Sequence, residues 1–196
     1  CIGGSFGGGN MFQSNQARMI VESTLNLDMD SDTFGWLFGV VLAGLVALVI
    51  VGGIKRIGQV TEKIIPLMCG IYVFTGFVIL VMNAGEIPAA IGLIFGEAFS
   101  VQAGIGGLVG VAVQGIKRAV FSNEAGIGSA AIAHSAAKTD EPVREGTVAM
   151  LGPFIDTVVI CTMTALVVIV TGAYNNPAAG AGVEMTNWAF GSAISW

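Results

Sequence analysis

Charged residues are scarce in this chain. Of its 196 residues, 8 are Lys or Arg and 13 are Asp or Glu, which makes 11% charged, against about 25% in a typical soluble domain. Hydrophobic residues make up 54%, and they fall in long blocks instead of alternating with polar ones. This pattern excludes a water-soluble globular domain, and we expect an all-α integral membrane protein.

Histidine and cysteine are also rare. His134 is the only histidine, so no metal cluster can be built around it within this sequence, and the three cysteines, Cys1, Cys69 and Cys161, do not form an even framework of disulfides. No nucleophile–base pair, serine elbow or basic, aromatic-interleaved surface appears. We therefore expect no enzyme, no enzymatic cofactor and no nucleic-acid partner.

Long apolar runs divide the chain into candidate membrane spans. Each run can cross a hydrocarbon core of about 30 Å, which takes roughly 20 helical residues. Asp156 is the only charge within the last of them. We expect spans at about residues 34–53, 64–85, 99–119 and 148–174, all in a single transmembrane domain that covers 1–196 and is incomplete at both ends. Residues 86–100 indicate a loop or a short helix lying on the membrane.

A polar-faced helix is expected at residues 11–27, after a glycine-rich start in which Asn10 is placed to cap it. Asn10, Gln13 and Ala17 share one stripe, and Arg18 and Glu22 stand at i,i+4 as an expected ion pair. Two interpretations stay open. The helix lies at the membrane surface or between other helices, or its amide side chains line a polar cavity.

Glycines interrupt the third span. Seven glycines fall between Gly104 and Gly128, and each costs a helix interior roughly 0.5–1 kcal/mol relative to alanine. Gly104, Gly106 and Gly107 therefore predict an unwound turn near 103–107. In lipid, free backbone groups are tolerated only against protein or a water-filled cavity, and in secondary transporters such broken helices bind substrate and ions.

Two other places carry polar groups at the spans. Asp156 lies about eight residues into the last span, where a carboxylate costs around 2.5–3.5 kcal/mol and marks an ion or substrate path by default; the alternative is a satisfied structural acid. Thr157 beside it offers an oxygen ligand, although threonine in such helices often bonds to its own backbone. Asn123 and Glu124 are candidates for an inner gate or cation path, or else belong to a helix cap and close packing.

Basic residues mark the cytoplasmic side. Lys and Arg flank the second and third spans at residues 54–63 and 117–147, whereas Asp28, Asp30, Asp32, Glu86 and Glu97 fall on the opposite side without any Lys or Arg. Residues 54–63 and 117–147 are therefore expected to be cytoplasmic loops of a multi-pass protein of the cell membrane.

Four motifs resemble one family. They are GGGNMFQSNQA at 7–17, GGIKRI at 52–57, IKRAVFSNEAGIGSAAIAHSAA at 116–137 and MLGPFIDTVVICTMTALVVIVTG at 150–172. Together they closely resemble the alanine or glycine:cation symporters, also called sodium:alanine symporters. Because the sequence begins at Cys1 and ends at Trp196, we expect an internal piece of such a protein.

The resemblance implies a fold, a function and a site. The implied fold is two inverted five-helix repeats, as in the LeuT-like amino acid–polyamine–organocation transporters, with residues 99–119 as the sixth core helix and 11–27 as the end of the third. The implied function is Na⁺-coupled symport of alanine or glycine by alternating access. By position, the expected substrate-binding residues are Asn10, Gln13, Ala103, Gly104, Gly106 and Gly107. The expected cation or gating residues, from the polar groups at the spans described above, are Asp156, Thr157, Asn123 and Glu124.

Two other function classes remain as alternatives. In a channel or receptor-like membrane protein the glycines would serve only close helix packing. In a membrane-embedded hydrolase Glu124 and Asp156 would act together, but the sequence offers no further residue to complete such a site.

The expected topology can be tested by thiol labelling of the full-length protein. Cysteines placed at Asp30 and Ala179 should react with an impermeant reagent added outside the cell, whereas a cysteine at Ser135 should not, because the basic side faces the cytoplasm. Labelling of Ser135→Cys from outside would contradict the arrangement.

Overall fold

The computed structural model describes residues 11–25, 30–98, 130–194 and a few positions between 110 and 116. Within these parts the chain is helical and has no strand. The elements, in chain order, are α2 (Met11–Leu25), α3 (Ser31–Ile50), α4 (Gly53–Met82), η1 (Ala84–Glu86), α5 (Ile87–Ala98), α7 (Ala130–His134), α8 (Pro142–Pro153), η3 (Phe154–Cys161), α9 (Thr162–Val170), η4 (Ala173–Asn175), η5 (Pro177–Ala179) and α10 (Val183–Ala193). The expected all-α class is confirmed.

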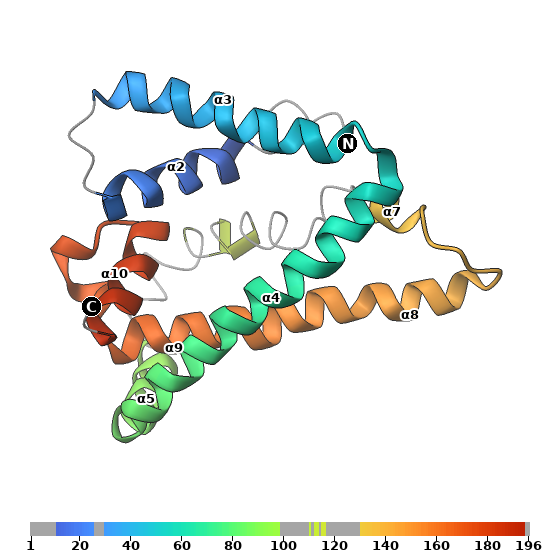
Figure 1. Cartoon of the computed structure of the whole chain (residues 1–196). Helices are drawn as coiled ribbons and strands as arrows, with labels where there is room; N and C mark the ends of the chain where they lie inside the picture. Colours follow the sequence, from blue (N-terminus) through green and yellow to red (C-terminus); the bar gives the residue numbers. More distant parts are fainter. Residues whose placement is uncertain are drawn as a thin grey trace.

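Within the described residues, three helical stretches are long and apolar enough to cross a membrane: Asp32–Ile50, Gly53–Met82 and Pro142–Val170. They overlap the first, second and fourth expected spans, and most of the third expected span lies outside the described residues. The last stretch runs through α8, η3 and α9, which Figure 1 shows as one long rod crossed by α4. Within it, η3 is a π-helix.

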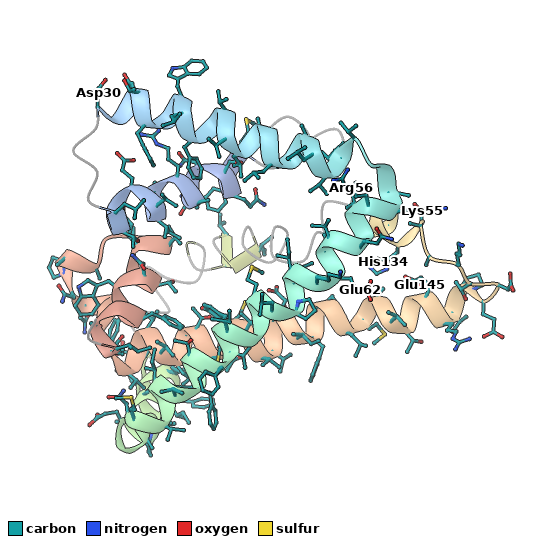
Figure 2. The ribbon with its side chains drawn as sticks, viewed as in Figure 1. Asp30, Lys55, Arg56, Glu62, His134 and Glu145 are labelled. Carbon is teal, nitrogen blue, oxygen red and sulfur yellow. The ribbon has the colours of Figure 1, made fainter. Side chains whose placement is uncertain are left out.

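The corner between α3 and α4 is built on glycine. Gly53 has a φ of 71°, in the left-handed region that residues other than glycine rarely adopt. The chain therefore reverses at Gly53 without an intervening loop, so that α3 and α4 pack against each other. Figure 2 shows Lys55 and Arg56 just beyond this corner and Asp30 at the far end of α3.

The expectation of a loop at 54–63 is wrong, because these residues form the first turns of α4. Lys, Arg, Gln and Glu are good helix formers, and a polar helix end has no need to stay within the hydrocarbon. Thirty residues of helix span about 45 Å, more than a bilayer core of about 30 Å. Pro66 consequently lies inside the helix.

Other boundaries differ less. In the expected loop or short helix at 86–100, Ile87–Ala98 form a short helix, α5. The expected loop at 117–147 ends earlier, because Pro142 begins α8, and proline is favoured at the first position of a helix. The connection after the last span contains two short 3₁₀ helices, η4 and η5.

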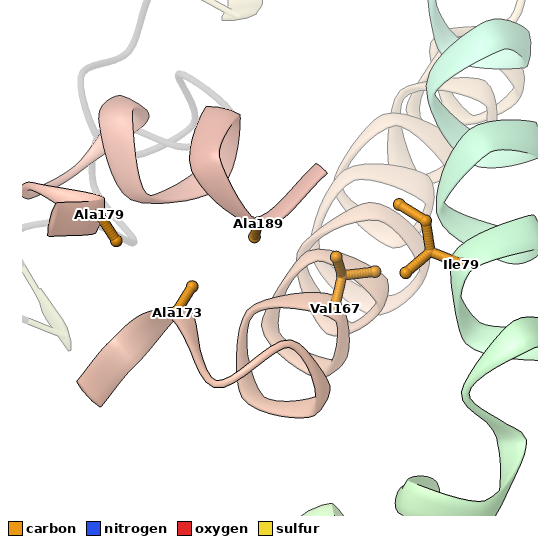
Figure 3. Close-up of a cluster of buried hydrophobic side chains, with 5 residues drawn as sticks. All are labelled: Ile79, Val167, Ala173, Ala179 and Ala189. Atoms are coloured by element: carbon orange, nitrogen blue, oxygen red, sulfur yellow. The ribbon is translucent and has the colours of Figure 1, made fainter. Parts of the chain in front are cut away.

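The buried core lies where α4, α9 and α10 meet. Ile79 of α4 and Val167 of α9 are fully buried and lie side by side, and alanines of η4, η5 and α10 complete the cluster (Figure 3). One turn from Ile79, Gly76 meets Met163: a Cβ added at Gly76 would stand 2.7 Å from the Met163 Sδ. Small residues thus let these helices approach closely, as is typical of membrane interfaces.

Ala179 takes part in this core and is 1% exposed. A cysteine there would be a poor labelling site whatever side of the membrane it faced. Asn175, which is exposed in the same connection, is the better outside probe.

We predict that Gly76→Leu destabilises the full-length protein by about 1–3 kcal/mol, the usual cost of overpacking. The leucine has no room beside Met163 and would push α4 from α9. The measurement is the thermal unfolding midpoint of the detergent-solubilised protein. Met163→Ala added to Gly76→Leu should restore part of the loss, and a double variant no more stable than Gly76→Leu alone would contradict the proposed contact.

Candidate functional site

Several expected site residues lie outside the described residues. They are Asn10, Ala103, Gly104, Gly106, Gly107, Asn123 and Glu124. The broken helix expected near 103–107 also lies outside the described residues. Of the expected site, the structure describes Gln13 on α2, and Asp156 and Thr157 on η3.

Gln13 lies on the exposed surface of α2, which packs against α3 and α10. The expected pair on the same helix is present, with Arg18 Nη2 3.4 Å from Glu22 Oε2. Arg18 also lines an open cavity of about 240 Å³ together with Asp32, Gly35 and Trp36. Gln13 is not among the described residues that line this cavity.

Asp156 and Thr157 lie in the π-helical stretch of the last span. Phe154–Cys161 makes a π-helix of 8 residues, directly after Pro153. Asp156 is half-buried and Thr157 is exposed. A π-helix has wider turns than an α-helix, is rare, and is frequently found at functional sites. Asp156, the only acid between residues 148 and 174, therefore lies where the backbone departs from α-helical geometry.

Sequence reasoning placed Asp156 correctly in an apolar helix but did not predict the π-helix. A signal was present in Gly152 and Pro153. Proline has no N–H to give to the carbonyl four residues earlier, and glycine weakens the helix beside it. Such a pair within an apolar run is a common place for a departure from regular helix.

Tyr72 was not expected at the site, yet it connects α4 to this stretch through Thr164. Tyr72 Oη lies 2.6 Å from Thr164 Oγ1. The Thr164 hydroxyl donates to the carbonyl of Ile160, within η3, at 2.7 Å. Tyr72 also stacks on Phe190 of α10, with ring centroids 5.1 Å apart and planes at 26°. No sequence pattern joins residues 92 positions apart, so this contact required the structure.

A second polar contact lies near the start of α8. His134 Nδ1 of α7 is 2.6 Å from Glu145 Oε1 of α8, and both side chains are partly exposed. Figure 2 shows them on the same side of the molecule as Lys55, Arg56 and Glu62 of α4. Among the described residues no group of three His, Cys, Asp or Glu side chains is placed to hold a metal ion.

The model of the sodium:alanine symporter family matches residues 1–196, the whole chain. The chain belongs to the sodium:alanine symporter family. This confirms the resemblance drawn from the four sequence motifs. It also confirms that the family is one of transporters and not of enzymes, which removes the hydrolase alternative.

Relatives within the family carry different substrate names. The chain is 49% identical over 169 residues to a sodium/alanine symporter, AgcS, of Methanococcus maripaludis, covering 86% of this chain and 36% of that protein. It is 35% identical over 152 residues to a sodium/proton-dependent alanine carrier of Bacillus sp. PS3, covering 76% and 34%. It is 33% identical over 189 residues to a probable sodium/glutamine symporter, GlnT, of Bacillus subtilis, covering 95% and 38%. The chain thus spans little more than a third of the length of each of these relatives.

Proposed function

We propose that the protein to which this chain belongs couples the entry of Na⁺ to the uptake of alanine or glycine across the cell membrane, by alternating access. The family match over the whole chain carries this proposal. It favours a symporter over the channel alternative. Three described membrane-length stretches fit such a role, with residues 117–147 expected on the cytoplasmic side.

The proposed cation site includes Asp156 and Thr157. A carboxylate and a hydroxyl supply the oxygen ligands that a hard cation such as Na⁺ prefers. Asp156 is half-buried in a membrane-length helix, where an ionisable group is expensive and is kept for function by default. Asn123 and Glu124 are proposed to belong to the inner gate or the cation path.

The proposed substrate site combines two segments. Gln13 and Asn10 offer amide groups, and the backbone exposed at Ala103, Gly104, Gly106 and Gly107 offers N–H groups to a carboxylate and carbonyls to an ammonium group. The surface position of Gln13 on α2 is compatible with such a role, because a residue that meets ligand must not be covered by the helix's own neighbours. Helices outside this chain would supply the remaining contacts.

We predict that Asp156→Asn raises the Na⁺ concentration for half-maximal alanine uptake at least tenfold. The amide keeps the size of the side chain but removes the negative charge that attracts the cation. The measurement is alanine uptake by the full-length protein in proteoliposomes, as a function of Na⁺ at fixed membrane potential. Glu86→Gln, the same chemical change at an exposed acid of η1, is the control and should leave the Na⁺ dependence unchanged.

An unaltered Na⁺ dependence in Asp156→Asn would remove this residue from the cation site. Uptake that does not saturate with alanine and does not require Na⁺ would contradict the symporter itself and return the channel as the better interpretation.

Substrate size provides a second prediction. In the proposed site, the backbone of Gly104, Gly106 and Gly107 would bring the chain close to the ligand. We therefore expect room only for a substrate whose side chain is a hydrogen or a methyl group. Alanine and glycine should compete for uptake whereas leucine and phenylalanine should not, and Gly106→Leu should abolish binding of both small substrates. One relative is named a probable sodium/glutamine symporter, so glutamine is the informative third competitor. Leucine competing as well as alanine would refute the size limit.

A further inference from the structure

Two hydrogen bonds in series connect α4 to the backbone of the π-helical stretch. A threonine hydroxyl has a single hydrogen, and that of Thr164 is donated to the Ile160 carbonyl. The Tyr72 hydroxyl must therefore be the donor in its 2.6 Å bond with Thr164 Oγ1. The direction of both bonds is fixed: Tyr72 donates to Thr164, and Thr164 donates to Ile160.

The end of this series lies close to the acid in sequence. Ile160 is four residues beyond Asp156, and η3 ends one residue later at Cys161. Each π-helical turn rotates the residues that precede it relative to a regular helix, so the point where η3 changes into α9 sets the direction of the Asp156 and Thr157 side chains. A side-chain hydroxyl bonded to the Ile160 carbonyl restrains the backbone where η3 changes into α9.

Tyr72 is itself held in place from two sides. Its ring stacks on Phe190 of α10, and on its own helix Gly76 and Ile79 are buried against α9. On α9, Val167 lies one turn after Thr164 and is fully buried. The hydroxyl of Tyr72 is thus presented to Thr164 by the best-packed part of the described structure.

We propose that Tyr72 is a positioning residue for the coupling cation: through Thr164 it fixes the π-helical stretch so that Asp156 and Thr157 are arranged to bind the ion. This rests on the proposed cation site. Tyr72 need not touch the ion. Its role resembles that of the outer partners of metal ligands, whose loss commonly weakens ion binding by about 10- to 100-fold.

The test uses the full-length transporter in proteoliposomes. Tyr72→Phe removes one hydroxyl and keeps the ring and its stacking on Phe190. It should raise the Na⁺ concentration for half-maximal alanine uptake about tenfold, while the maximal rate at saturating Na⁺ stays within about twofold. Thr164→Val should have the same effect, and the double variant should be no worse than either single variant, because all three break one series of bonds.

Two control variants are matched to these. Tyr174→Phe makes the same change at the only other tyrosine, which is 44% exposed in η4, and should leave Na⁺ dependence unaltered. Thr164→Ser keeps the hydroxyl and should also leave the Na⁺ dependence unaltered. A Tyr72→Phe protein that unfolds at lower temperature but retains normal half-saturation by Na⁺ would overturn the proposal, since Tyr72 would then only stabilise the helix pair.

Asp156→Asn separates the two levels of the argument. If Asp156→Asn raises the Na⁺ concentration for half-maximal uptake and Tyr72→Phe does not, the cation site stands and the positioning role is refuted. If Asp156→Asn has no effect, the cation site is refuted, and the positioning role that depends on it is refuted with it.

Discussion

The backbone of a membrane span must satisfy its own hydrogen bonds, because the hydrocarbon core offers it no water. This constraint explains why the described chain is helical and why its few departures from α-helix are supported. At Gly53 a glycine accepts the left-handed turn. Thr75 and Thr171 donate their hydroxyls to carbonyls of the preceding turn, as Thr164 does at the end of the π-helical stretch. These threonine hydroxyls thus form hydrogen bonds with the backbone of the preceding turn.

Lipid also removes the usual reason for helices to associate, since hydrocarbon tails are as apolar as leucine. Close packing has to provide the attraction instead. The buried cluster shows how: Ile79 and Val167 are the largest fully buried side chains among the described residues, and Ala173, Ala179 and Ala189 are small enough for three segments to converge. The polar bond between Tyr72 and Thr164 is placed beside this cluster. Shape and one hydrogen bond together set the crossing of α4 and α9.

The sequence predicted those features that depend on neighbouring residues. Uncharged runs revealed the spans, the i,i+4 spacing revealed the pair of Arg18 and Glu22, and four motifs revealed the family. The start of α4 was misplaced because charge was taken as the end of a helix, although Lys55 and Arg56 are good helix formers. The π-helix and the contact between Tyr72 and Thr164 could not be predicted, since they depend on segments far apart in the chain.

The surfaces of the spans indicate where the rest of the protein must pack. Only 6% of the residues in the most apolar part of Asp32–Ile50 are buried, and 11% in each of the other two stretches. Lipid can cover apolar side chains at no cost, so most of this surface requires no protein partner. Exposed polar groups at membrane depth are different, because hydrocarbon leaves their hydrogen bonds unmade. The face of the last span that carries Thr157 is therefore one that further helices, water or ligand must meet, and an ion-coupled transport site needs such a face.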